Sequence, residues 1–212
     1  GLPEIPAGEH QNVGWMSQGR EKANDAVTLE VNFGEVREFD AIQLFAAKRP
    51  TSDLPSGFGF PRRFTVSVPD TGNGAFEKKF ETGNPGHTPV YFPLGRCRGR
   101  TVKIEVTELW KAYESYPAFV AFSEVEVLDG EQNRSLGAAV RSPGEMGTVI
   151  GSGYQTWSTA SLSDGFGPDG RLVSRRTWLA TASRCRSWAS MNSSRRSAKA
   201  SYPPLARNAP SG

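Results

Sequence analysis

The sequence predicts an all-β, antiparallel sandwich, and three observations support this fold class. Between residues 27 and 128, short β-rich runs alternate with turn residues. No segment of helical length carries a sustained apolar stripe at 3.6-residue spacing. Val102, Ile104 and Val106 alternate with the charged Lys103 and Glu105, which is typical of antiparallel strands with one buried face. Several such runs separated by turns predict a sandwich or jelly roll.

The expected strands follow one another at short intervals. Gly, Pro, Asn and Asp stand between them, and these are the residues that tight turns prefer. The expected strands are 27–33, 41–46, 64–68, 76–80, 90–94, 101–108 and 119–128.

The connections between these strands differ in length, and counting them along the chain assigns each one to an end of the sandwich. If successive strands run antiparallel, their connections alternate from one end to the other. The short connections 34–40, 69–75 and 95–100 then share what we call the short-loop end. The segment before Val27 and the connections 48–63, 81–89 and 109–118 share the opposite, long-loop end.

The long-loop end collects aromatic and polar side chains. Sites for sugars and peptides are commonly built in this way, since a flat ring stacks on apolar C–H surfaces while polar neighbours fix the orientation. Structural alternatives stay open, because Phe58 and Phe60 can plug the sandwich, Trp110 can cap the core and His87 can be an ordinary loop histidine. The candidate ligand-binding residues are Arg49, Phe58, Asn84, His87, Trp110, Tyr113, Glu114 and Tyr116.

Charge is divided unevenly along the chain. Residues 1–130 carry 14 Lys and Arg against 18 Asp and Glu, whereas residues 131–212 carry 11 against 4. We expect residues 1–130 to form the sandwich, 131–170 to form a partial second unit or a strand that packs back on the first, and 171–212 to be a disordered, mostly irregular basic tail. The tail lacks the interleaved aromatic residues of a single-strand-binding groove, so we expect no nucleic-acid partner, and no membrane contact is expected.

No catalytic constellation is expected, and we predict that the chain is not an enzyme. Cys97 and His87 fall at opposite ends of the sandwich, whereas a nucleophile and its base must lie within hydrogen-bond reach. No zinc-ligand spacing occurs. A disulfide between Cys97 and Cys185 is not expected, because a flexible tail rarely fixes the distance that a disulfide needs.

An ordered set of segments resembles a known superfamily over residues 12–130. The segments are GWMS at 14–17, VTLEVNFG at 27–34, FDAIQL at 39–44, GFPRRFTVSV at 59–68, RTVKIEV at 100–106 and FSEVEV at 122–127. Together they resemble the discoidin, or coagulation-factor type C, superfamily, which includes the family-32 carbohydrate-binding modules and has a galactose-binding-like fold.

The resemblance implies a jelly roll whose ligand site lies among the loops at one end. It implies a non-catalytic carbohydrate-binding module for oligo- or polysaccharides, present as an accessory domain of a larger, extracytoplasmic or secreted protein. The alternative is a protein- or phospholipid-interaction module of the same fold, in which Phe58 and Phe60 would be exposed apolar spikes.

Members of this superfamily often carry a structural calcium ion, and Glu124 matches the ligand in the last strand. The other ligands come from an Asp-Gly loop ahead of the first core strand, and no such loop precedes Trp15. A segment at 133–165 resembles the opening of another such unit and contains Asp164-Gly165. One interpretation is that it folds back and supplies the missing strand and loop. Alternatively, Glu124 is a strand carboxylate paired with a Lys or Arg.

Overall fold

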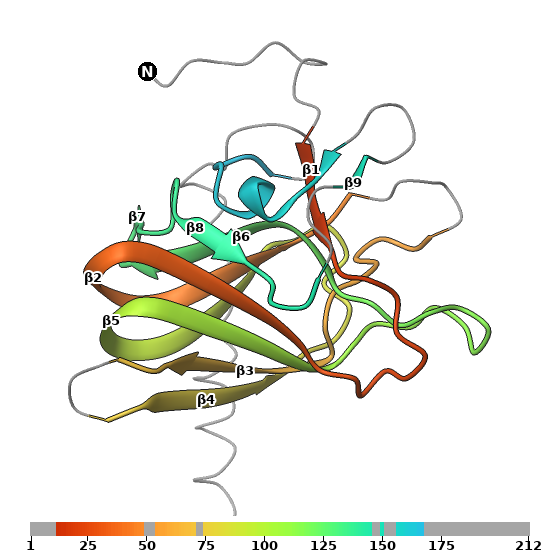
Figure 1. The fold of residues 1–212 in the computed structure, drawn as a ribbon, viewed down its shortest axis with the longest axis horizontal. Helices are drawn as coiled ribbons and strands as arrows, with labels where there is room; N and C mark the ends of the chain where they lie inside the picture. The colour runs from red at the N-terminus through yellow and green to blue at the C-terminus, as the bar shows by residue number, and fades with distance from the viewer. Residues whose placement is uncertain (1–11, 49–53, 71–73, 146–148, 151–155, 168–212) are drawn as a thin grey trace, which may run out of the picture.

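The computed structural model describes residues 12–48, 54–70, 74–145, 149–150 and 156–167, and the regular structure in them is almost entirely β (Figure 1). The expected all-β sandwich is confirmed. The described residues also include the 3-10 turn η2 (Thr159–Leu162). The strands are β1 (Asn12–Met16), β2 (Val27–Ala46), β3 (Arg63–Val68), β4 (Phe76–Glu81), β5 (Val90–Glu108), β6 (Ala121–Asp129), β7 (Gln132–Asn133), β8 (Ala139–Arg141), β9 (Val149–Ile150) and β10 (Thr156–Trp157).

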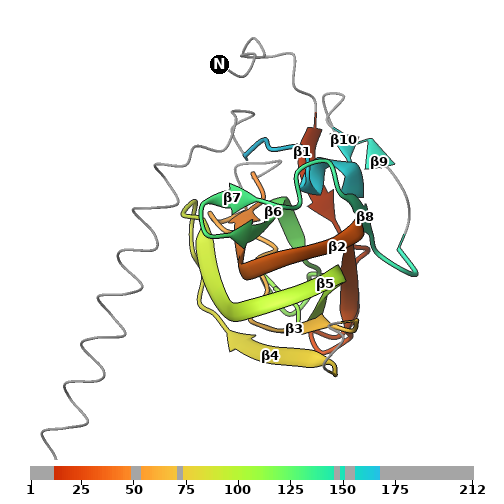
Figure 2. The same cartoon turned by 90° about the vertical axis from the view of Figure 1, so that its left-hand side faces the viewer.

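Hydrogen bonds link these strands in the order β4-β3-β5-β2-β6-β1-β10-β9, with β7 on β6 and β8 on β2. The pairs are antiparallel except that β1 and β10 run parallel. Two strands are much longer than the rest, with 20 residues in β2 and 19 in β5. They bend together, so that one half of the pair lies in each layer of the sandwich (Figure 2).

This bend differs from the sequence prediction, which treated 34–40 and 95–100 as loops. The two segments instead pair with each other, with Phe39 opposite Cys97 and Glu38 opposite Arg98. Gly34 (φ +77°) and Gly95 (φ +88°) stand at the bend in left-handed conformations that side chains disfavour. The sequence shows two turns, whereas in the structure the turns lie against each other and their backbones form hydrogen bonds.

The core between the layers is built from alternate residues of the long strands. Val102, Ile104 and Val106 are buried, as their alternation predicts. A smaller group of buried residues packs at the long-loop end, and we call it the end cluster. Its members are Ala47, Leu54, Phe58, Trp110, Phe119, Ala121 and Trp157.

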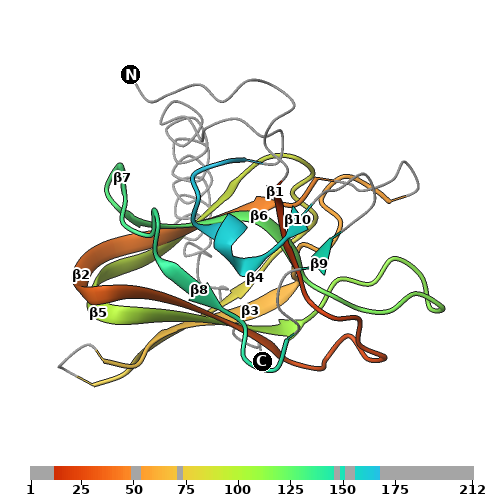
Figure 3. The same ribbon diagram turned by 45° about the horizontal axis from the view of Figure 1, so that its top comes forward.

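Residues that follow β6 return to the sandwich and cover it. β8 pairs with the first half of β2, β10 lies beside β1, and η2 packs on β1 and β6 (Figure 3). Val140, Trp157 and Leu162 are buried in these contacts. Glu145 is nearly buried, accepts a hydrogen bond from the amide of Gln18 at 2.7 Å and pairs with Arg20. The expected disordered tail, 171–212, lies outside the described residues.

Among the described residues there is no helix with the length and apolar character needed to cross a membrane.

Candidate functional site

The long loops meet at one end of the sandwich. The amide of Leu109 donates to the carbonyl of Ala23 at 2.7 Å, and that of Ala121 donates to the carbonyl of Gly59 at 2.8 Å. Arg20 and Ala118 form a further bridge between loops. Segments distant in sequence are therefore held side by side by backbone hydrogen bonds.

The loop between β5 and β6 presents two tyrosines to solvent. Tyr113 is 65% exposed and Tyr116 is 40% exposed. Reciprocal backbone hydrogen bonds between Trp110 and Phe119, at 3.1 and 3.0 Å, close the base of this loop. The Tyr116 ring leans on Phe119 with centroids 6.4 Å apart. The loop thus carries aromatic surface on a hydrogen-bonded base.

A charged pair flanks the tyrosines in the same loop. Lys111 Nζ lies 3.5 Å from Glu114 Oε2, and the Glu114 side chain is fully exposed. An exposed ion pair of this kind contributes little to stability. Both groups are therefore available to a ligand as hydrogen-bond donors and acceptors.

A second polar group comes from two other loops. His87 Nε2 lies 3.0 Å from Ser56 Oγ, and Asn84 Nδ2 donates to the Ser56 carbonyl at 2.9 Å. Asn84 Oδ1 accepts from the amide of Gly86 at 2.9 Å. Gly57 (φ +73°) is required here, because a Cβ on it would lie 2.0 Å from Asn84 Oδ1. Asn84 and His87 are thus brought together through Ser56, which the sequence prediction did not include.

Two predicted ligand contacts need correction. Phe58 is 0% exposed and Trp110 is 7% exposed, so neither ring offers a free face to a ligand. They pack edge-on against each other with centroids 6.3 Å apart, and both contact Phe119. Phe60 is also buried. These rings fill the protein beneath the loops, as the structural alternative held, while Arg49 lies outside the described residues.

Glu124 is buried, and the structure brings the Asp-Gly segment to it. Its Oε1 accepts a hydrogen bond from the amide of Gly165 at 3.1 Å, while its Oε2 has no hydrogen-bond partner in the described part of the chain. Burial and then the nearby negative charge of Asp164 raise the pKa of Glu124 to about 9. No Lys or Arg pairs with it among the described residues.

Glu126, two residues along the same strand, is also buried. Its burial raises its pKa to about 7, although Asn133 Nδ2 donates a hydrogen bond to it at 3.2 Å. The described residues contain no group of three or more His, Cys, Asp and Glu side chains placed to hold a metal ion.

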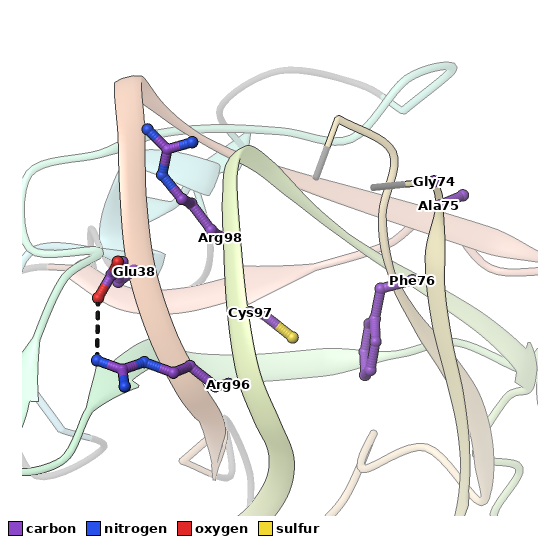
Figure 4. A pocket seen from close by; sticks show the side chains of 7 residues that line it. All are labelled: Glu38, Gly74, Ala75, Phe76, Arg96, Cys97 and Arg98. Carbon is purple, nitrogen blue, oxygen red and sulfur yellow. Dashed lines mark hydrogen bonds and ion pairs between the residues drawn. The ribbon is translucent and has the colours of Figure 1, made fainter. Parts of the chain in front are cut away.

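A pocket of about 420 Å³ lies at the short-loop end, between β4 and the bend of β5. The sulfur of Cys97 points towards the Phe76 ring, whereas the side chains of Arg96 and Arg98 extend to the other side of β5 (Figure 4). Cys97 is a free thiol whose pKa is raised by burial. Cys185 lies outside the described residues.

Comparisons with known proteins give a partial likeness to a solved structure. No protein-family model matches the sequence, and no curated protein matches it. Among solved structures, a fucose-binding module from Streptococcus pneumoniae aligns with 51% of this chain and 69% of its own, with 15% sequence identity and a TM-score of 0.33.

Proposed function

We propose that this chain is a non-catalytic carbohydrate-binding module that binds oligo- or polysaccharides through the long-loop end of its sandwich. The observation that carries the proposal is the exposure of Tyr113 and Tyr116 on a loop whose base is fixed by hydrogen bonds. The proposal includes an accessory role in a larger, extracytoplasmic protein, as the superfamily resemblance implies.

Tyrosine rings suit sugars because the apolar C–H faces of a pyranose stack on an aromatic ring. Little side-chain entropy is lost on binding, since Tyr has only two rotatable side-chain bonds. Lys111 and Glu114 supply a donor and acceptors beside the rings, and Asn84 and His87 supply further polar groups at the same end. Ring stacking would provide the affinity, and the polar groups would select hydroxyl positions.

The alternative phospholipid-binding role receives less support. It requires Phe58 and Phe60 as exposed apolar spikes, and both rings are buried. A surface built on Tyr113 and Tyr116 instead favours ligands with small apolar faces.

A glycan screen tests the proposal. Neutral, acidic and galactose- or fucose-type oligosaccharides would be titrated while Trp fluorescence is recorded, because Trp110 lies at the base of the tyrosine loop. Tyr113→Ala and Tyr116→Ala should each weaken binding by about tenfold. Val36→Ala, at an exposed residue of the bend in β2, is the matched control and should bind as the parent does. An unchanged affinity in both tyrosine variants would overturn the proposal.

We also propose that Glu124 and Asp164 hold a structural calcium ion. A buried carboxylate oxygen of Glu124 and the neighbouring, half-buried Asp164 fit a hard cation, which prefers oxygen ligands. Calcium takes about six to eight ligands, so backbone carbonyls and water would complete the set. Calcium should raise the melting temperature at pH 7.5, and the same addition to Glu124→Gln should leave it unchanged.

A further inference from the structure

The end cluster joins the candidate binding loops to the segment that returns after β6. Phe58 stands at its centre. Its ring packs edge-on against Trp110 at 6.3 Å, contacts Phe119 at 6.0 Å, and packs edge-on against Trp157 at 6.3 Å. Tyr116 in turn contacts Phe119. Rings from three separate segments, which are the β2–β3 connection, the β5–β6 loop and β10, therefore form one contiguous group.

Phe58 also sits in the loop that carries the polar half of the site. Its amide donates to the carbonyl of Pro55 at 3.2 Å, closing the turn that contains Ser56. Ser56 holds both His87 and Asn84. The position of the Phe58 ring therefore determines where this turn lies relative to the tyrosine loop.

Trp157, from the segment that returns after β6, packs against Phe58. Its side chain is 6% exposed, and its backbone lies beside Gly14 of β1. The next amide, that of Ser158, donates to the Gly14 carbonyl at 2.9 Å. The backbone that carries the indole is thus anchored on the sandwich, and the ring is buried against Phe58.

We propose that Trp157 is a positioning residue of the binding surface, acting through Phe58 on both the tyrosine loop and the Ser56 turn. The inference rests on the proposed function, because it assigns a role within that same surface. Without the indole, Phe58 gains room to move, and the two halves of the surface lose their fixed separation.

The test compares two deletions in the same returning segment. Trp157→Ala removes the ring that contacts Phe58, whereas Leu162→Ala removes an equally buried side chain that packs in the main core. Both variants lose stability, so the measurements are made on the full chain at a temperature where each is folded. Trp157→Phe, which retains a ring, serves as the conservative rescue.

The first readout is amide hydrogen exchange, which requires no ligand. In Trp157→Ala, exchange at Phe58 and Trp110 should accelerate by about two- to tenfold relative to Leu162→Ala, as expected from the loss of one edge-on ring pair. The second readout is affinity for whichever oligosaccharide of the screen binds the parent chain, which should fall in Trp157→Ala and recover in Trp157→Phe.

Equal exchange rates at Phe58 and Trp110 in the two alanine variants would overturn the positioning role. So would an affinity that falls equally in both. If no glycan binds the parent chain, the carbohydrate proposal fails, whereas accelerated exchange confined to Trp157→Ala would still support the coupling between the segment and the loops.

Discussion

Replacing Glu124 by Gln should make the calcium-free protein more stable at neutral and alkaline pH. The folded state keeps this carboxyl protonated, with a pKa of about 9 against an ordinary 4.5, because it is buried and near Asp164. At pH 7 the acid is held protonated about 2.5 pH units above its ordinary pKa. At about 1.4 kcal/mol per pH unit, this lowers the free energy of unfolding by about 3 kcal/mol, compared with a carboxyl whose pKa does not change on folding.

The sign of the pH dependence follows from the direction of the shift. Since the pKa is raised on folding, the stability is greatest below about pH 4.5 and falls as the pH rises towards about 9. Glutamine carries no charge to bury, and its amide oxygen still accepts the hydrogen bond from Gly165. The difference between variant and parent should therefore grow steadily from pH 5 to pH 9.

Urea denaturation followed by Trp fluorescence, in EDTA at pH 5, 6, 7 and 8, measures this difference. Glu126, with its pKa of about 7, contributes a pH dependence common to both proteins. Parallel stability profiles for the parent and Glu124→Gln, at a constant separation, would refute the reasoning. Adding calcium at pH 8 should stabilise the parent alone and so reduce or reverse the gap.

Three further outcomes are expected. Gly59→Ala should lower the free energy of unfolding, measured by urea denaturation, by about 2–4 kcal/mol, because the added Cβ would lie 2.5 Å from the Cβ of Ala121 at a φ of +70°. Gly34→Ala, at φ +77° in open space, should lower it by only about 1–2 kcal/mol, and equal losses in the two variants would contradict this reasoning. Arg20→Met leaves the nearly buried Glu145 without its cation, and should lower the free energy of unfolding by about 1–3 kcal/mol and expose β8 to proteolysis. Undiminished stability would contradict the structural role of the pair. Asn84→Ala removes the hydrogen bond to the Ser56 carbonyl and the one from the amide of Gly86, and should weaken glycan binding in titrations. Less than about 1 kcal/mol should be lost in unfolding because the side chain is exposed, and unaltered binding would exclude the polar half of the surface.

The strands could be predicted from the sequence because the alternation of apolar and charged residues is a local pattern. Val102, Ile104 and Val106 are buried as their spacing predicts, and the long loops meet at one end as the counting of connections predicts. The pairing of Phe39 with Cys97 was not accessible, because it depends on two turns distant in sequence lying against each other.

The site was predicted less well than the fold. The run Gly57-Phe58-Gly59-Phe60 is compatible with buried rings and with exposed rings. Phe58 is buried because Trp110 and Trp157, both far along the chain, pack against it. Exposure of Tyr113 and Tyr116 could be predicted because they alternate with charged and small residues in a loop. Ser56 gave no signal, since its role depends on two residues of another loop.

The shared bend of β2 and β5 has a consequence for how the chain folds. Val27 pairs with Val106, and Leu44 with Val90, so the two strands that connect the layers join residues widely separated in sequence. Closing such long loops costs entropy before most contacts form, which places the chain among slow-folding β-proteins with times of milliseconds to seconds. Because both strands pass through both layers, neither layer can unfold alone, and the sandwich should be lost in a single cooperative step.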